Sequence, residues 1–436
     1  IIQPIALGQL QIVSNFKKRT ILFILMTIKI LLAAISLLAL KVDAQKLATL
    51  KVSPNASISS GFVHNASINL DEITFLLGSE LSLIEVKDNE RNEVPYQLEN
   101  GKTRILHWQF SSEIMNSPQY FELVKKRPKT FKSSMTLTED GGRLNVNKNN
   151  QQLLAYQFGE MPAPEGVDKA YARSGFIHPL NTPKGQRLTR IQPKDHYHHY
   201  GLWNPWTHVL FEGDTIDFWN LNKKQATVRF ANFLKQEEGP IYANYSALHE
   251  HLVLKRENDK VALNEVQNIR VYQGNQDYYL LDFSLDMSPA SKSPFHILEY
   301  RYAGFGWRTT EEWGDHNSLV LSSEGKTRKD ADGSTAKWCI VQGELGDSYG
   351  GAIMMSHPGN YNHPEPLRIW PEGQYDRGDM FANFAPTKNM DWVLNSGKMY
   401  NLKYRMLVFN GKMSAQKAEA AWQAFANPIK IEIEKP

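Results

Sequence analysis

The chain has 436 residues, of which 42% are hydrophobic and 11% aromatic, and this composition excludes a wholly disordered or collagen-like protein. Its single cysteine, Cys339, excludes an intrachain disulfide framework and a cysteine-rich metal site. The net charge is +3, but without residues 1–44 the chain holds 44 basic and 45 acidic residues, which gives no reason to expect nucleic acid or an anionic membrane as a partner.

The N-terminal residues have the pattern of an export signal. A short basic start at Met26 precedes eleven uncharged, mostly apolar residues and a Val-x-Ala ending at Ala44. We expect a signal peptide over residues 26–44, an upstream extension over residues 1–25, and an exported protein that is periplasmic or extracellular, with no membrane span after cleavage. A membrane anchor over residues 21–40 is the alternative, but a lysine interrupts the apolar run.

Residues 45–130 are predicted to form a small β domain. Alternating or apolar β-type patterns occur at residues 72–77, 81–86 and 104–110, with turn-forming residues between them. The basic, polar stretch 125–132 is interpreted as a linker, and a functional basic patch is the alternative.

Residues 131–428 are predicted to form a large β-sandwich domain, where we expect catalysis to occur. Ser414 can cap a single helix over residues 415–425. Many strands and few helices predict an all-β fold, a large antiparallel β-sandwich that follows the small β module and ends in one helix. The predicted strands of this domain are residues 134–138, 143–146, 226–230, 250–254, 269–272, 278–285, 351–355 and 402–409.

Residues 171–221 concentrate histidines and hold three of the ten tryptophans. Clustered imidazoles suit proton transfer or metal ligation. On an extended strand, His196 and His198 would project to one face and His199 to the other. We therefore predict His196 and His198 as ligands of a divalent metal ion, and the alternative is that the histidines hydrogen-bond a turn. The candidates for a third ligand are His178, Asp195 and His357.

The aromatic residues and the cysteine have simpler interpretations. Trp203, Trp206 and Trp219 either fill the core or form a platform for the apolar face of a sugar ring. Cys339 lies in a β-type run and is interpreted as buried and inert.

Two further segments carry candidate binding residues. Residues 299–316 contain Arg301 and Arg308, which could grip a carboxylate or sulfate bidentately or pair with nearby acidic residues. A proline-rich loop contains His357 and Asn360, which could face a cleft or stabilise a turn.

These motifs resemble a secreted bacterial family once labelled "methane oxygenase PmoA-like", which is associated with polysaccharide degradation in Bacteroidetes. The resemblance covers residues 150–425 and implies a β-supersandwich of the galactose-mutarotase-like kind. Some members of the family are implicated in oligosaccharide dehydration. The motifs that carry the resemblance are residues 173–180, 195–203, 217–220, 304–308 and 357–360.

Our leading hypothesis is an exported carbohydrate-active enzyme that acts on acidic, uronate-containing oligosaccharides by β-elimination, as a dehydratase or a lyase. Such a reaction needs a cation that neutralises the carboxylate, a base and an acid. The candidate cations are Arg173, Arg308 and a His-bound metal ion, the candidate bases His196 and His199, and the candidate acids Tyr302 and Tyr300. The predicted substrate-binding residues are His178, Trp203, Trp206, Trp219, Arg301, His357 and Asn360.

Two other functions stay open from the sequence. A glycoside hydrolase would need two carboxylates across a cleft. A non-catalytic carbohydrate-binding protein would use the tryptophans and not the histidines. A copper or electron-transfer role lacks a Cys–Met ligand pattern. The candidate carboxylates for hydrolysis are Asp195, Asp217, Glu299, Glu311 and Glu312.

Overall fold

The structure is a computed structural model in which strands dominate, and in its described residues they form five antiparallel sheets beside one α-helix. The predicted all-β class is therefore confirmed. No helix in the described ranges combines the length and the apolar character that crossing a bilayer requires. The signal peptide predicted over residues 26–44 and the extension before it lie outside the described residues. The described residues are 45–53, 61–88, 90–111, 117–255 and 258–436.

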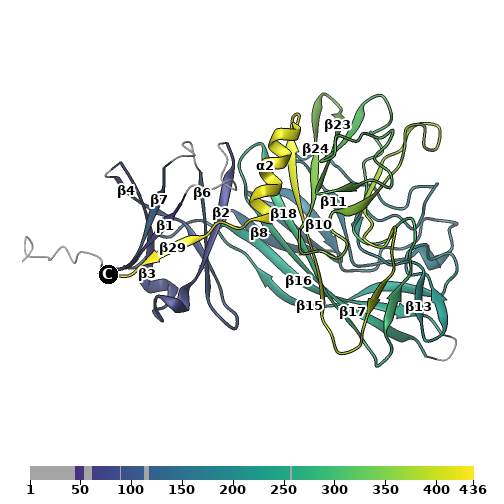
Figure 1. Ribbon diagram of the computed structural model, residues 1–436, viewed down its shortest axis with the longest axis horizontal. Helices are drawn as coiled ribbons and strands as arrows, with labels where there is room; N and C mark the ends of the chain where they lie inside the picture. Colours follow the sequence, from purple (N-terminus) through teal and green to yellow (C-terminus); the bar gives the residue numbers. More distant parts are fainter. Residues whose placement is uncertain (1–44, 54–60, 89, 112–116, 256–257) are drawn as a thin grey trace, which may run out of the picture.

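Two small sheets at one end of the molecule share a core (Figure 1). The five-stranded sheet has the order β29-β1-β7-β3-β4, and the three-stranded sheet has the order β2-β6-β5. Because β29 pairs with β1, the end of the chain returns to these N-terminal sheets. The bounds are β1 Gln45–Val52, β2 Val63–Asn69, β3 Leu81–Lys87, β4 Glu90–Val94, β5 Tyr96–Glu99, β6 Ile105–Ser111, β7 Gln119–Lys125 and β29 Ile431–Glu434.

One of the two large sheets has eight long strands in the order β15-β16-β17-β18-β28-β24-β23-β21. Inward side chains alternate with outward ones along these strands, as in β17, where every second residue is buried over most of its length. The bounds are β15 Ala226–Glu237, β16 Tyr242–Val253, β17 Lys260–Tyr272, β18 Tyr278–Pro289, β21 Ser318–Ser322, β23 Trp338–Leu345, β24 Ser348–Ser356 and β28 Tyr400–Asn410.

The other large sheet has nine shorter strands in the order β22-β25-β26-β20-β12-β11-β10-β9-β8. Its buried face and that of the eight-stranded sheet share one hydrophobic core. The bounds are β8 Met135–Asp140, β9 Arg143–Lys148, β10 Gln151–Gln157, β11 Phe176–Leu180, β12 Leu202–Trp203, β20 Gly306–Arg308, β22 Thr335–Ala336, β25 Glu365–Ile369 and β26 Phe381–Phe384.

Smaller elements complete the molecule. A four-stranded sheet has the order β14-β13-β19-β27. Helix α2 (Ala415–Ala426) packs Trp422 against the eight-stranded sheet, and the Ser414 hydroxyl caps it by accepting from Lys417 N, as predicted. The other bounds are β13 Val209–Phe211, β14 Asp214–Ile216, β19 Phe295–Ile297, β27 Trp392–Leu394, and the 3-10 helices Leu70–Glu72, Gly78–Glu80 and Lys169–Tyr171.

Most predicted strands are present, but the strand predicted over residues 72–77 is wrong. Asn69 caps a 3-10 helix there by accepting from Asp71 N. The Asp71 carboxylate then receives Arg104 Nε at 2.6 Å, and Arg104 Nη1 donates to Leu76 O at 2.7 Å. These bonds hold the segment as a loop without a strand partner. Its Ile73 and Leu76 pack against the core of the small sheets, whereas Phe75 and Leu77 are exposed.

Candidate functional site

Residues 193–199 form two consecutive turns that bring three imidazole rings together. His196 N donates to Pro193 O at 2.9 Å, and His199 N donates to His196 O at 3.0 Å. The ring centroids of His196, His198 and His199 lie 4.6–5.1 Å apart. The expectation of an extended strand with His199 on the opposite face is therefore wrong, since the turns place all three rings in one cluster.

The chain leaves this histidine cluster directly into the nine-stranded sheet. Gly201 has φ +55°, and a Cβ there would lie 2.2 Å from Ile177 O, so only glycine fits this approach to β11. Strand β12 follows and pairs with β20, which places Arg308 beside the cluster. Segments more than 100 residues apart in the sequence therefore meet at one edge of the site.

Arg308 is the buried charged centre of the site. Its Nη2 donates to Asp195 Oδ2 and to Asp379 Oδ2, both at 2.9 Å, and its guanidinium lies over the Trp370 ring at 4.4 Å. Burial and the nearby charge of Arg190 lower the pKa of Arg308 to about 10, which leaves it charged at neutral pH. Its side chain has no exposed surface, so it cannot reach a substrate carboxylate in this conformation.

A hydrogen-bonded chain runs from the centre to solvent. His196 Nδ1 lies 2.8 Å from Asp195 Oδ2, and His196 Nε2 lies 3.1 Å from the hydroxyl of Tyr375, which is 45% exposed. Although burial disfavours the ionised form, the bond from His196 and the charge of Arg308 hold the pKa of Asp195 well below its usual range. A carboxylate, an imidazole and a phenol in this order can relay a proton.

Aromatic rings surround the cluster on the protein side. His199 packs on Phe381, Trp203 and Trp370 at centroid distances of 5.1, 5.2 and 5.6 Å, and Trp203 packs on Trp219 at 5.1 Å. Trp203 and Trp219 are almost fully buried, so they offer no surface to a sugar here. They fix the rings of the histidines instead.

Burial keeps two of the three imidazoles neutral. It lowers the pKa of His199 well below its ordinary value and, together with the charge of His196, lowers the pKa of His198 to about 3. His196 and His198 are partly exposed, whereas His199 is buried. His199 therefore cannot contact a substrate directly, and only the other two rings are accessible.

Arg173 lies behind the cluster and is also buried. Its Nη1 donates to Phe218 O at 3.4 Å, its guanidinium lies 5.6 Å from the Tyr200 ring centroid, and the buried carboxylate of Glu265 acts on its charge. Burial lowers the pKa of Arg173 to about 10. A cavity of about 610 Å³ has Arg173 in its lining but none of the three clustered histidines.

Tyr302 and His178 lie at the border of the site. The Tyr302 hydroxyl donates to Asn220 Oδ1 at 3.0 Å, and its ring packs on Trp219 at 5.0 Å. His178 contacts Thr189 Oγ1 through Nδ1 at 2.9 Å, and burial lowers its pKa to about 4. Arg301 is exposed and lies against the ring of Tyr302, at 5.4 Å from its centroid.

Three of the predicted binding residues have contacts away from the cluster. Trp206 is fully buried in the main core, with its ring 6.0 Å from that of Trp392. The His357 ring packs against Phe425 of α2, and Asn360 is held by Glu365 at 2.8 Å. The described contacts of these three residues are structural.

One contributing segment, the loop that follows β25, is not among those predicted from the sequence. It supplies Trp370, Tyr375 and Asp379, and Asp379 also receives Arg190 at 2.7 Å. The loop combines aromatic and charged residues with glycine and proline, as the histidine segment does. This similarity of composition could have indicated that the loop belongs to the candidate site.

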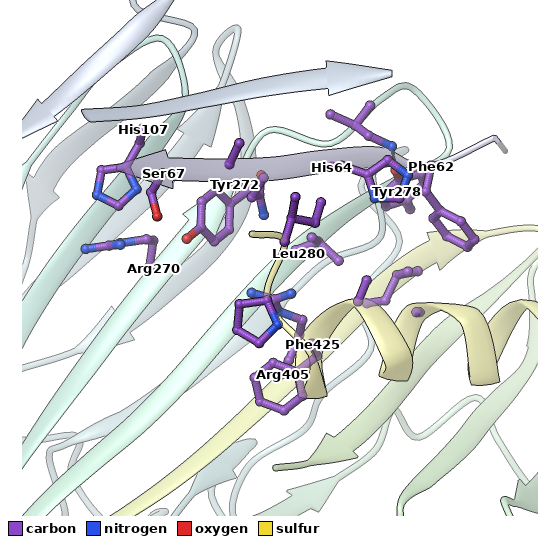
Figure 2. Close-up of a pocket in the computed structure, with 18 of the residues that line it drawn as sticks. Phe62, His64, Ser67, His107, Arg270, Tyr272, Tyr278, Leu280, Arg405 and Phe425 are labelled. Atoms are coloured by element: carbon purple, nitrogen blue, oxygen red, sulfur yellow. Dashed lines mark hydrogen bonds between the residues drawn. The ribbon is translucent and has the colours of Figure 1, made fainter. Parts of the chain in front are cut away.

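A second cavity, of about 230 Å³, lies between the small sheets, the eight-stranded sheet and α2 (Figure 2). Its labelled cations are already paired, because Arg270 donates to Glu99 at 2.7 Å and Arg405 binds Asp282 through two bonds of 2.5 and 2.8 Å. Tyr278 accepts a bond from Val63 N at 2.6 Å across the same boundary. These contacts dock the small sheets onto the large ones.

Comparisons with known proteins give a family but no activity. No curated protein matches the chain. Among solved structures it is similar to the crystal structure of heparan sulfate lyase HepC from Pedobacter heparinus, at 10% identity and a TM-score of 0.31, over 66% of this chain and 38% of that chain. A superposition this weak carries no argument about activity. Residues 143–423 match the model of a family of unknown function (DUF6807), and the chain belongs to this family.

Proposed function

We propose that the protein is a carbohydrate-active enzyme that acts on acidic, uronate-containing oligosaccharides by β-elimination, as a dehydratase or a lyase. The observation that supports this most is the chain from Asp195 through His196 to the exposed hydroxyl of Tyr375. It offers a proton acceptor and a proton donor at one accessible point, which is what an elimination needs.

The proposed reaction uses Tyr375 as the group that touches the substrate. His196 Nε2 takes the phenol proton, and Asp195 stabilises the imidazolium that results. The phenolate removes the proton beside the uronate carboxylate, and the electrons of that C–H bond form the new carbon–carbon double bond as the C4–O bond breaks. Tyr375 then gives the proton that it removed to the departing oxygen, so that donor and acceptor act on the same face of the sugar. The His196 imidazolium finally returns the first proton to the phenolate, which restores the starting state.

Arg308 is a positioning residue in this proposal. It is paired with Asp195 and Asp379 and buried, so it holds Asp195 in place and does not bind the substrate. Arg173 is equally enclosed. Arg377 is exposed, but its Nε and Nη2 are occupied by Asp379 and by Glu311 O. The cation that the substrate carboxylate requires must therefore come from another group.

The sugar-binding surface is proposed to lie at the exposed aromatic residues rather than at the buried tryptophans. The Tyr375 ring packs on Trp370 at 4.9 Å, and the half-buried Tyr197 packs on Tyr171 at 5.6 Å. Tyrosine rings with one free face suit the apolar face of a sugar, while their hydroxyls reach water.

We further propose that the protein is exported, on the strength of the signal-peptide pattern at residues 26–44 and of the resemblance to the secreted PmoA-like family. The chain is proposed to fold as a small β domain over residues 45–130 and a large β-sandwich over residues 131–428.

The proposed function is tested by following the ultraviolet absorbance of an unsaturated uronate during incubation with uronate-terminated oligosaccharides. We expect absorbance to rise with the wild-type protein and not with Tyr375→Phe. Release of reducing sugar without this absorbance would overturn elimination in favour of hydrolysis.

A further inference from the structure

The three clustered histidines have the spacing of a metal site. One nitrogen from each of His196, His198 and His199 can be chosen so that all three lie within 4.8 Å of one another, and the ring centroids are 4.6, 4.8 and 5.1 Å apart. Tetrahedral zinc bound to imidazole nitrogens at roughly 2.0–2.1 Å holds the rings at about this spacing. Small side-chain movements would bring the nitrogens to the metal.

Three of the four ring nitrogens of His198 and His199 have no hydrogen-bond partner among the described residues. In the part of the chain that the structure describes, no group forms a hydrogen bond with either nitrogen of His198. His199 has one weak contact, 3.5 Å from Nδ1 to Arg308 Nη1, and none at Nε2 among the same residues. Clustered imidazoles that make few and weak hydrogen bonds are suited to coordinate a cation.

The third histidine is oriented as a ligand would be. His196 Nδ1 is held by Asp195 Oδ2 at 2.8 Å, which leaves Nε2 as its ligand atom, now in contact with the Tyr375 hydroxyl at 3.1 Å. A carboxylate on the far nitrogen of a ligating histidine fixes the tautomer and raises its basicity. Arg308 in turn holds Asp195 at 2.9 Å, so the support of the ligand is rigid.

The charges around the cluster leave room for a divalent cation. Arg308 and Arg190 are matched by Asp195 and Asp379. Asp217 is near enough for its charge to act on His198. The charge of the buried Arg173 also acts on His198 and opposes a cation there, so the three imidazoles would have to supply most of the binding.

We propose that His196, His198 and His199 bind one divalent transition-metal ion, of which zinc is the best match, with an open position toward Tyr375. His199, rather than any of the third-ligand candidates named from the sequence, then completes the ligand set begun by His196 and His198. This ion would supply the positive charge that the substrate carboxylate requires, and that role rests on the function proposed above. Coordination by His196 Nε2 would also release the Tyr375 hydroxyl, which that atom contacts at 3.1 Å. Because a ligating nitrogen cannot accept a proton, the phenol proton would then pass to water rather than to His196.

The test is metal binding, measured without substrate. Full-length protein is stripped with a chelator and titrated with Zn²⁺ by calorimetry, and bound zinc is counted by mass spectrometry after desalting. We expect one tight site per chain, which His198→Ala and His198→Gln abolish. Asp195→Asn should weaken binding by about 10–100-fold, as loss of a carboxylate behind a ligating histidine does.

His316→Ala is the matched control, because His316 is exposed and lies outside the cluster. It should bind zinc as the wild type does. Co²⁺ should give a visible absorption band in the wild type and the control but not in the His198 variants, whose folding is checked by circular dichroism. Equal zinc binding by wild type and both folded His198 variants, or no binding by any of them, would overturn the metal site. Zinc binding without an unsaturated product would keep the metal site and refute elimination.

Discussion

Tyr375 is the residue at which the hydrogen-bonded chain from Asp195 reaches solvent. Tyr375→Phe removes its hydroxyl but keeps the ring that packs on Trp370. We expect turnover to fall by about 10²–10⁴-fold, the usual contribution of a positioned acid–base group. The melting temperature should hardly change, because no buried group loses a partner. Kinetics of unsaturated product formation measure the effect.

Tyr120→Phe is the control for this loss, since Tyr120 lies on β7 of the small sheets and is exposed. Its turnover should equal that of the wild type. Undiminished turnover in Tyr375→Phe would show that the Tyr375 hydroxyl takes no part in the reaction.

Arg308 matters for stability as well as position. Arg308→Met removes a fully buried cation that pairs with the buried Asp379 and with the partly exposed Asp195. We expect the free energy of unfolding to fall by ~3–5 kcal/mol, measured in urea. Arg229→Met removes a half-exposed partner of Glu250 and should cost ~1 kcal/mol or less. Equal losses in the two variants would contradict a buried charged centre.

The sequence indicated which residue types gather at the candidate site and indicated less about how they meet. The histidine run and Arg308 could be singled out because they are concentrated in unusual motifs. The sequence could not distinguish Trp206, which lies in the main core, from Trp203, which packs against the histidines. The core around Trp206 is formed partly by the opposite sheet, and a local sequence pattern does not show which residues that sheet covers. Tyr375 and Asp379 were missed because nothing in sequence spacing links them to position 196.

At the scale of elements, β25 joins the two large sheets through a buried carboxyl group. Glu365 accepts hydrogen bonds from Ser356 at 2.6 Å, Asn360 at 2.8 Å and Tyr404 at 2.9 Å, which brings β24 and β28 to β25. Complete burial raises the pKa of Glu365 to about 7, despite these donors.

The pKa of Glu365 is higher in the folded protein than in the unfolded chain. Folding is therefore accompanied by uptake of a proton between about pH 4.5 and 7. Stability should therefore fall as pH rises through this range and level off above it, by on the order of 3 kcal/mol in total. We expect Glu365→Gln to lose this component, as measured by urea unfolding at several pH values. The exposed Glu324→Gln should keep it. An identical pH profile in Glu365→Gln and the wild type would contradict the assignment.

The strand patterns were predictable where one face of a strand is buried, since alternation then appears in the sequence. Strands such as β12, with two residues, carry no such pattern. The turns at 193–199 were misjudged as extended chain, because the backbone bonds to Pro193 and His196 that define them have no signature in side-chain periodicity.

At the level of the whole molecule, strand β29 pairs with β1 and so joins the C-terminal residues to the five-stranded sheet. Ile431 and Ile433 on β29 pack against the core of the small sheets, and β29 covers the edge of β1. Removal of residues 429–436 exposes that edge and core. Hydrogen exchange at the β1 amides should become about tenfold faster or more, while β17 stays protected.

A chain that lacks only Lys435 and Pro436 should exchange as the wild type does, because these residues follow the strand. Unchanged protection of β1 after the longer deletion would mean that β29 adds nothing to the small sheets.

Mass spectrometry of the products from a panel of uronate-containing oligosaccharides distinguishes elimination at Tyr375 from hydrolysis. Elimination predicts a product lighter than the substrate by one water for a dehydratase, or two fragments whose masses sum to that of the substrate for a lyase. Either product should be lost in Tyr375→Phe. Fragments that together have gained one water would contradict elimination, and an unsaturated product formed at full rate by Tyr375→Phe would contradict the site.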